Sequence, residues 1–424
     1  MPAPRPPMLL TAASYYGTLA AARCLGRRGI AVTMAERHLL APARWSRFVT
    51  RREACPDIAE AERFLAWAER FGESNPGHVL YPTTDDHAWL FALHRERLAR
   101  SFRLYSPPVD AVYTLLNKKR LHHAAHAAGL DTPRTWFPET ERDLGALSDA
   151  RFPVLIKPQT QVLFPSRSKG SRAEERSQLE ERFREFRAWQ HHGLALVERD
   201  PGVESPIVQE LHPQAAQGIY SLAGFVDESG ELFVVRASTK VLQRPRKLGI
   251  GLCFEEAPVE PDVAEGVRRL CRQIGYFGVF EVEFIVAGGR FLLIDFNPRL
   301  YSQLAFDVDR GMPLPLLVYL GAVGDRAALE AEVRRASAVG LSGDRVYCHR
   351  FVLEVLLRGQ TLSGRMPPQA ARSWRRWLVE HRERATDAVA AEDDRLPTLV
   401  DLALHLYGYA RHPRAFWRSM ILDV

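Results

Sequence analysis

The stretch from Glu281 to Arg299, EVEFIVAGGRFLLIDFNPR, limits the folds open to this chain more than any other. Its two halves, residues 279–286 and 291–296, are rich in β-branched and aromatic residues, and Ala287-Gly288-Gly289 separates them. Two such runs joined by a short glycine-containing turn are typical of a β-hairpin. We therefore expect two antiparallel strands here, with a tight turn at the glycines.

Polar side chains interrupt both predicted strands. Because side chains alternate between the faces of a strand, Glu281 and Glu283 share one face of the first strand. Asp295 and Asn297 likewise share one face of the second strand. A two-residue turn would put the two pairs on opposite sides of the sheet, whereas a three-residue loop would put them on the same side.

A shared side would crowd carboxylates and an amide oxygen together, and these are ligands that Mg²⁺ prefers, commonly in the company of phosphate. The alternative is an acidic face that is merely solvated. Asp295 and Asn297 lie inside an apolar run that is closed by Pro298, which is an unusual place for solvated residues. The pattern therefore favours a metal site.

The size and composition are those of an ordinary globular protein. A chain of 424 residues is long enough for two or three domains, and no apolar run approaches the 18 residues of a membrane span. The N-terminus lacks the apolar segment of a signal peptide, so we expect a cytoplasmic protein without a membrane partner. The five cysteines are scattered without a CxxC pair, which indicates buried thiols rather than disulfides or zinc ligands.

The net charge of +6 is modest for this length. Basic runs such as Lys118-Lys119-Arg120 and SWRRW have no nucleic-acid recognition motif beside them, and helices with arginine on the solvent face explain most of the excess. We therefore expect no nucleic-acid partner. An anionic small ligand such as a nucleotide fits the charge equally well.

The N-terminal part opens with a β-α-β pattern, a strand at residues 8–13 followed by a helix and a second strand at 30–34. A dinucleotide-binding turn needs three glycines, and only Gly17 is present. We therefore expect no such site, although Glu36 lies where a ribose-binding acid would. Farther on, Thr84 and Asp85 follow a predicted strand and are either helix caps or substrate contacts.

Lys157 lies within the apolar strand pattern VLIKP. A buried ammonium group needs a partner or an anion, because burying it unpaired costs several kcal/mol. The polar segment 159–177 follows, with one glycine, and its composition indicates a mobile segment. Beyond Arg310 the chain has a mainly helical pattern.

In this order, the motifs resemble those of the ATP-grasp superfamily. Its elements are a helix that opens at Asn117-Lys118, the strand lysine, the VQEL strand and a hairpin that ends in DFNPR. Lys118 and Gly129 lie eleven positions apart, and Glu283 and Asp295 lie twelve apart. The resemblance covers roughly residues 8–320. The motifs PTTD, NPR and DDRLP look more specifically like the D-aspartate-ligase-like branch, among the carboxylate–amine ligases.

The resemblance implies an α/β protein with the ATP-grasp fold, a Rossmann-like N-terminal domain and a mainly helical C-terminal extension. It divides the chain into residues 1–110, an ATP-grasp domain at 111–325 with a flexible lid lobe at about 152–210, and a helical region at 326–424. The implied cofactors are ATP and Mg²⁺, with Mn²⁺ as an alternative ion. The implied partners are small carboxylate and amine substrates, amino acids among them, and a homodimer is left open.

The resemblance also implies roles for individual residues in holding the nucleotide. Lys118 and Lys157 would contact its phosphates. Backbone groups at Gln209, Glu210 and Leu211 would meet the adenine at the hinge between two lobes. Gln217 would contact the ribose.

The hairpin would hold the metal. Glu283 stands at the first acidic position of the family pattern, which leaves Glu281 as a bystander. Arg299 would steady the transferred phosphate, a contact that suits guanidinium geometry. The metal ligands implied are Glu283, Asp295 and Asn297, and the catalytic basic groups implied are Arg299, Arg236 and Lys240.

This sequence departs from the family pattern in two places. Asp295 stands where a glutamate is usual, so its carboxylate is one methylene shorter. The loop after the strand lysine is normally glycine-rich and closes over phosphate through backbone N–H groups. Here it offers Gly170 with the cations Arg167 and Lys169, so loop closure would depend on side-chain charge.

The activity that the resemblance implies is ligation of a carboxylate to an amine. The carboxylate attacks the γ-phosphate of ATP, and the amine then attacks the acyl phosphate to give an amide or peptide bond, ADP and phosphate. Two alternatives remain on the same fold. One is a kinase-like phosphotransferase, and the other is a regulatory protein that binds nucleotide without turnover.

Overall fold

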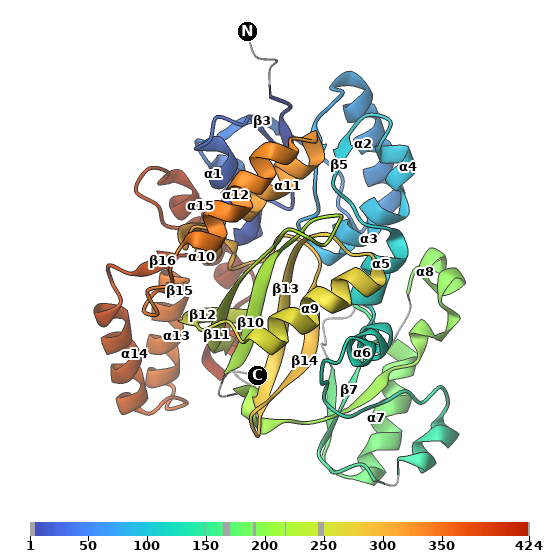
Figure 1. The fold of residues 1–424 in the computed structure, drawn as a ribbon. Coiled ribbons are helices and arrows are strands. Elements are labelled where there is room, and N and C mark those ends of the chain that lie inside the picture. Colours follow the sequence, from blue (N-terminus) through green and yellow to red (C-terminus); the bar gives the residue numbers. More distant parts are fainter. Residues whose placement is uncertain are drawn as a thin grey trace.

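The structure is a computed structural model that describes residues 5–147, 149–163, 170–189, 192–216, 218–244 and 250–422. We call these residues the described chain. They form an N-terminal parallel sheet, a small antiparallel sheet and a large central sheet (Figure 1). No helix of the described chain has the length and apolar character needed to cross a membrane.

The N-terminal sheet is parallel and has the strand order β3-β2-β1-β4-β5 within the described chain. Every residue of β1 and β2 is buried, as in parallel sheets that helices cover on both faces. Helices pack around these strands at the top of Figure 1. The elements are β1 (Met8–Thr11), α1 (Tyr16–Gly26), β2 (Val32–Ala35), β3 (Val49–Glu53), α2 (Ala61–Ser74), β4 (Val79–Leu80), α3 (Asp85–Leu93), α4 (Arg95–Leu98), β5 (Arg103–Leu104) and α5 (Val109–Leu116).

The small sheet has the strand order β6-β9-β7-β8 in the described chain and includes the segment predicted as a lid lobe. It starts earlier than residue 152, because Thr135–Trp136 pairs with β9. Helix α7 packs on it through its own apolar cluster, which includes Leu179 and Phe183. The elements are α6 (Lys118–Ala127), β6 (Thr135–Trp136), β7 (Val154–Lys157), β8 (Ser171–Ala173), α7 (Arg176–Trp189), α8 (Leu194–Arg199) and β9 (Ile207–Glu210).

The central sheet has the order β14-β13-β10-β11-β12-β15-β16 in the described chain. Its core strands are antiparallel and α9 covers one face, as Figure 1 shows. The C-terminal region is mainly helical as expected, but it also adds β15 and β16 to the edge of this sheet. The strands are β10 (Ile219–Val226), β11 (Phe233–Arg244), β12 (Ile250–Ala257), β13 (Gly278–Ala287), β14 (Arg290–Asn297), β15 (Val346–Cys348) and β16 (Ala385–Asp387).

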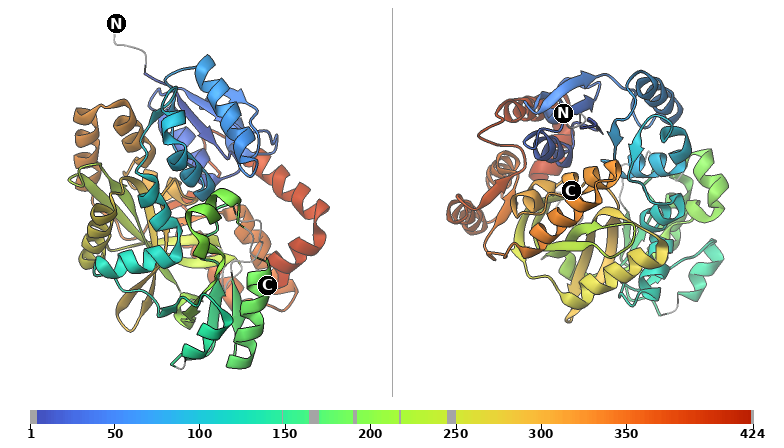
Figure 2. Two further views of the ribbon diagram at one scale, coloured as in Figure 1. Left: turned by 90° about the vertical axis from the view of Figure 1, so that its right-hand side faces the viewer. Right: turned by 45° about the horizontal axis from the view of Figure 1, so that its top comes forward.

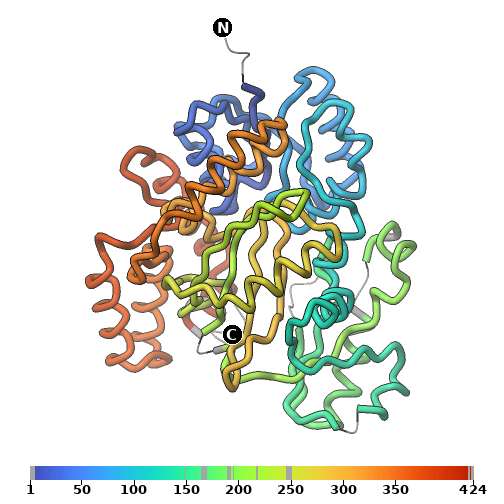
Figure 3. The backbone as a smooth tube through the Cα atoms, viewed as in Figure 1, coloured from blue at the N-terminus to red at the C-terminus, as the bar shows by residue number. Residues whose placement is uncertain are grey.

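Among the remaining helices, α11 packs between two of the sheets. α11 is buried along most of its length because it lies between β4 and β5 of one sheet and β10 and β13 of the other. Figure 3 traces the chain from the N-terminal sheet through the small sheet and back to the central sheet. The helices are α9 (Pro261–Ile274), α10 (Leu304–Asp309), α11 (Leu314–Val323), α12 (Arg326–Ala338), α13 (Arg350–Leu362), α14 (Pro368–Glu380), α15 (Leu396–Arg411) and α16 (Pro413–Phe416).

A buried ion pair fastens the C-terminal region to the N-terminal unit, beside which its helices lie in Figure 2. Asp394 accepts hydrogen bonds from Arg23 Nε at 2.8 Å, Ser46 Oγ at 2.7 Å and the backbone N of Arg47 at 2.9 Å. The Asp394 side chain is only 1% exposed, whereas the neighbouring pair of Asp393 with Arg27 is about half exposed. The two adjacent aspartates therefore differ mainly in burial.

This difference predicts unequal effects on stability. Asp394→Ala should lower the free energy of unfolding by about 3–5 kcal/mol, because it leaves the Arg23 guanidinium buried without its anion. Asp393→Ala is the matched control and should cost about 0–1 kcal/mol. Urea unfolding followed by circular dichroism measures both. Equal losses for the two variants would contradict the assigned role of the Asp394 pair.

Candidate functional site

The β13–β14 hairpin has the same-side arrangement of acids, although it reaches it by a different route from the one expected. Gly288 and Gly289 both have positive φ, +58° and +77°, and form a two-residue turn in which Ala287 pairs with Arg290. A β-bulge then adds one residue, Ile294, to β14 and shifts the register. Beyond the bulge the opposed pairs are Glu283 with Asp295 and Glu281 with Asn297.

The bulge thus gathers the polar residues on the face of the sheet away from α9. Phe280, Val282 and Phe284 alternate with the two glutamates and belong to the apolar cluster under α9. Without the bulge, Asp295 would lie opposite Val282 and face that cluster. The three-residue loop is therefore wrong as the cause, while the predicted common face is present.

Glu281 is a central member of this face rather than a bystander. It is 2% exposed and accepts hydrogen bonds from Asn297 Nδ2 at 2.6 Å, Gln303 Nε2 at 3.0 Å and the hydroxyl of Ser221. Burial, together with the neighbouring charge of Glu283, raises the pKa of Glu281 to about 7. Glu281 therefore fixes the orientation of the Asn297 amide.

Two lysines bind the other two carboxylates. Lys118 Nζ lies 2.9 Å from Asp295 Oδ1, and Lys240 Nζ lies 2.6 Å from Glu283 Oε1. Burial opposes the charge of both ammonium groups, but the adjoining carboxylates outweigh it and raise the pKa of each lysine. Lys118 is the first residue of α6, so the start of this helix fixes its position. Asn117 caps the helix, and its side chain accepts hydrogen bonds from two backbone N–H groups.

Lys157 approaches from the small sheet at the end of β7. Its Nζ donates to Gln209 Oε1 at 2.9 Å, and Gln209 Nε2 donates in turn to Thr135 Oγ1 at 3.0 Å. Burial, and then repulsion by Lys118, lowers the pKa of Lys157 to about 8. The two lysines therefore act on each other electrostatically, although they come from different elements, α6 and β7.

The remaining nucleotide positions are only partly described. Glu210 and Leu211 lie at the end of β9, where the chain leaves the small sheet for the central one. Gln217 lies outside the described chain, as do Arg167 and Lys169. Gly170 lies against β7, where an added Cβ would come within 2.8 Å of the Ile156 carbonyl oxygen.

Arg299 joins the hairpin to the N-terminal sheet. Its Nη2 donates to Asn297 Oδ1 at 2.7 Å, and its Nε donates to Asp85 Oδ1 at 2.6 Å. Burial disfavours the guanidinium charge, but Asp85 outweighs it and raises the pKa of Arg299. Thr84 caps α3, whereas Asp85 accepts a hydrogen bond from Arg299. The sequence left both roles open, and the PTTD motif after a strand was the signal that pointed to Asp85.

The guanidinium of Arg236 points away from the grouped side chains. It lies on the same face of β11 as Lys240, but its guanidinium donates to the carbonyl oxygens of Ala336 at 2.6 Å and Val339 at 3.3 Å. These carbonyls belong to the C-terminal end of α12, which needs such donors. Arg236 is therefore occupied in holding α12, away from the grouped side chains.

Local packing accounts for the two residues that resembled a dinucleotide site. The Glu36 carboxylate accepts from the backbone N of Ala13 at 3.2 Å and of His38 at 3.0 Å. A Cβ on Gly17 would lie 2.2 Å from the Tyr301 carbonyl oxygen, so this glycine lets α1 approach the segment after the hairpin. Neither residue is left available for a ribose or a pyrophosphate.

The residues on the hairpin face fit Mg²⁺. Glu283, Asp295 and Asn297 offer only carboxylate and amide oxygens, the hard ligands that this ion takes. Ammonium groups already lie against two of the carboxylates, which shows that this face attracts positive charge. A divalent ion would take over part of that neutralisation.

Comparison with known proteins gives a likeness of structure rather than of sequence. No family model matches the chain, and neither does any curated protein. Among solved structures, the phosphoribosylglycinamide synthetase of Anaerococcus prevotii aligns with a TM-score of 0.56 at 14% identity, over 81% of this chain and 80% of that one. The chain has the ATP-grasp fold.

Two further structures show the same ATP-grasp fold. The biotin carboxylase domain dimer of Hydrogenobacter thermophilus 2-oxoglutarate carboxylase, in complex with MgADP, ADP and bicarbonate, has a TM-score of 0.56 at 14% identity, over 79% of this chain and 70% of that one. The L-amino acid ligase of Bacillus licheniformis has a TM-score of 0.54 at 16% identity and covers 75% of each chain. At these identities the comparison establishes the fold alone.

The hairpin geometry predicts where a divalent ion binds. With a non-hydrolysable ATP analogue present, Mn²⁺ should bind the protein and lose affinity by about 100-fold or more in Asp295→Asn, since even residues that only orient a ligand change metal affinity 10–100-fold. Electron paramagnetic resonance of free Mn²⁺ measures this. The control is Asp131→Asn, because Asp131 pairs with Arg290 at the exposed end of the hairpin. Equal Mn²⁺ binding by both variants would show that the ion binds elsewhere.

Proposed function

We propose that this protein is an ATP-dependent ligase that joins a carboxylate to an amine through an acyl phosphate, with release of ADP and phosphate. The observation that carries the proposal is the mixed charge of one surface. Three carboxylates and an amide lie on the hairpin face, and Lys118, Lys157, Lys240 and Arg299 converge on it from other elements. Such a surface suits a metal ion together with a polyphosphate.

The lysines supply the phosphate-binding part of the proposal. Lys118 and Lys157 repel each other, and a phosphate group between them would relieve that repulsion. Lys118 begins α6, and its Nζ reaches the hairpin face at Asp295. The contacts of Lys157 with Gln209 tie this lysine to β9, which leads into the proposed adenine hinge.

The metal part rests on Glu283, Asp295 and Asn297. When bound, Mg²⁺ would neutralise charge on the phosphates and draw electron density from the transferred group. Glu281 holds the amide of Asn297 in place, so the ligand set does not have to reorganise on binding. Lys240 Nζ contacts the Glu283 carboxylate and orients it.

Arg299 supplies the contact to the reacting group. Asp85 and Asn297 hold its guanidinium from two sides, and the side chain is only 12% exposed. A guanidinium fixed in this way can stabilise negative charge that develops on the γ-phosphate and then on the acyl phosphate. Because Asp85 begins α3 of the N-terminal unit, we propose that the carboxylate substrate binds between that unit and the hairpin.

The chemistry balances with these groups and needs no nucleophilic side chain. A carboxylate oxygen of the substrate attacks the γ-phosphorus while the bond to the ADP oxygen breaks. The amine nitrogen then attacks the acyl carbon, the phosphate leaves, and the nitrogen gives up a proton. The protein positions the reactants and stabilises charge in both steps.

Substrate pools test the proposal. The protein with ATP and Mg²⁺ should release ADP when pools of amino acids or related acids and amines are supplied, and hydroxylamine should trap the activated acid as a hydroxamate. Mass spectrometry should then find a condensed product smaller by one water than its two parts. Asp295→Ala should abolish ADP release by at least about 100-fold.

Three outcomes would count against the ligase. A stable phosphorylated product formed without an amine would indicate a phosphotransferase. ATP binding without ADP release for any pool, in a protein that binds Mn²⁺ at the hairpin, would indicate a regulatory binder. ADP release that Asp295→Ala leaves unchanged would place the reaction outside the hairpin.

The lowered pKa of Lys157 predicts the pH dependence of ATP binding. Below about pH 8 the side chain is a cation that can hold phosphate, and above that pH the free protein must first take up a proton. ATP affinity should therefore fall as the pH rises beyond 8, towards about tenfold per pH unit.

Lys157→Arg is the matched variant, because arginine keeps its charge throughout this range. Its ATP affinity should stay nearly constant between about pH 7 and pH 9.5 in calorimetric titrations. The same decline in both proteins would assign the pH effect to another group.

A further inference from the structure

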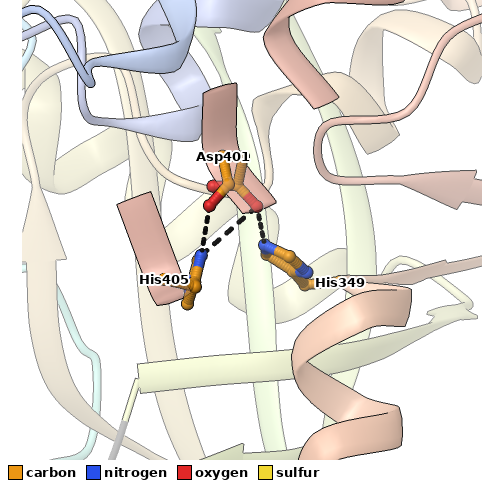
Figure 4. A group of neighbouring side chains, drawn as sticks. All are labelled: His349, Asp401 and His405. Carbon is orange, nitrogen blue, oxygen red and sulfur yellow. Dashed lines mark hydrogen bonds and ion pairs between the residues drawn. The ribbon is translucent and has the colours of Figure 1, made fainter. Parts of the chain in front are cut away.

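The C-terminal region holds a second group of metal-ligating side chains, separate from the hairpin. His349, Asp401 and His405 each offer one ligand atom, and these three atoms all lie within 4.8 Å of one another. Figure 4 shows the two imidazole rings turned towards the Asp401 carboxylate. His349 lies between β15 and α13, whereas Asp401 and His405 are one turn apart on α15.

From this geometry we propose that these three residues bind one divalent transition-metal ion of the zinc class. His349 Nε2 lies 3.1 Å from Asp401 Oδ2, and His405 Nδ1 lies 3.4 Å from the same oxygen. Zinc bonds of 2.0–2.2 Å in a tetrahedron place neighbouring ligand atoms about 3.3–3.6 Å apart. The two separations are therefore close to those of ligands around a common ion.

The geometry at His349 Nε2 favours coordination of an ion over a simple hydrogen bond to Asp401. Its side chain is 6% exposed, and its Nε2 makes no aligned hydrogen bond within the described chain despite the short distance to Asp401. A buried imidazole nitrogen that lies close to a carboxylate without an aligned hydrogen bond suits coordination of one ion by both groups. Two imidazoles with one carboxylate favour Zn²⁺, Co²⁺ or Ni²⁺ over Mg²⁺.

The surroundings are mostly aromatic. The Tyr16 ring packs edge-on against His349 at 5.0 Å, and Phe351 and Tyr409 flank His405 at 5.7 and 5.8 Å. The Tyr16 hydroxyl lies 3.4 Å from the other Asp401 oxygen. His405 is 14% exposed, so solvent reaches one side of the group.

Three contacts compete with the ion. Val352 N–H donates to His349 Nδ1 at 3.3 Å, and coordination at Nε2 would move the ring proton to Nδ1 and end that bond. His405 Nδ1 lies 2.9 Å from the Asp401 carbonyl oxygen, which also attracts its proton. The charge of Arg244 opposes a cation beside His405. The Asp401 carboxylate must offset all three, so it is the residue on which binding depends.

The site would hold α13 and α15 together across the edge of the central sheet. α15 also contacts the segment Pro42–Trp45 of the N-terminal unit. An ion at His349 would therefore fix the C-terminal region near the start of α1, where Tyr16 lies. This role is independent of the proposed ligase activity and uses none of the hairpin residues.

Zinc titration of the full-length, metal-free protein in competition with a chromophoric chelator tests the site. The wild type should bind one tight Zn²⁺, and Co²⁺ in its place should give the visible absorption of a tetrahedral complex. Asp401→Asn, which keeps the size of the side chain, should raise the Kd for Zn²⁺ by more than about 100-fold and abolish the Co²⁺ spectrum. An excess of Mg²⁺ should leave Zn²⁺ binding unchanged.

Two control variants locate the ion. His126→Ala disrupts another pair of histidines on a helix, because the ring centroids of His122 and His126 lie 4.5 Å apart on α6. This variant should retain the wild-type affinity for Zn²⁺. Asp295→Ala should also retain it, so failure of the ATP site and failure of this site are distinguishable. The proposal is overturned if the wild type binds no Zn²⁺, or if Asp401→Asn binds as tightly as the wild type while folded by circular dichroism.

Discussion

The site depends on one chain of hydrogen bonds between three separated parts of the sequence. Arg299 donates to Asp85 of the N-terminal unit and to Asn297 of the hairpin, and Asn297 donates to Glu281. Each member carries an ionisable group or an amide, and Glu281 and Arg299 are largely enclosed, so the loss of a partner leaves a polar group buried and unsatisfied. The chain orients the metal-ligating amide and the guanidinium together, and it fixes the hairpin relative to the N-terminal sheet.

The charged groups on the hairpin face influence one another's pKa values. Glu281 is so enclosed, and so close to Glu283, that its pKa rises to about 7, while Lys157 is pushed in the opposite direction by burial and by Lys118. Burial contributes most to both pKa shifts, and a neighbouring like charge adds to each. A bound metal polyphosphate brings a cation to the acids and anions to the lysines, which would relieve both kinds of repulsion.

Part of this arrangement could be predicted from the sequence. The hairpin follows from its strand pattern, the architecture was implied by the resemblance to ATP-grasp proteins, and the fold comparisons confirm that architecture. The bulge at Ile294 could not be predicted, because it depends on how β14 packs against both β13 and α9. The C-terminal strands β15 and β16 were missed for a related reason. They are only three residues long and are held by the edge of an existing sheet.

Individual side chains were harder to assign than elements. Arg236 lies on the predicted face, yet the end of α12 draws its guanidinium away, and no local pattern indicates that. The histidine and aspartate group of the C-terminal region lies in two segments about fifty residues apart in the sequence. The i,i+4 spacing of Asp401 and His405 was its only sequence signal. Tertiary contacts decide such cases, because several positions on one face are chemically equivalent until a neighbour selects one.

The most direct test of the central claim is a calorimetric titration of the full-length protein with ATP, in the presence and absence of Mg²⁺. If the hairpin and the three lysines form a metal-nucleotide site, one ATP should bind per chain and the affinity should rise when Mg²⁺ is added. No heat of binding under either condition, from protein shown to be folded, would contradict the account.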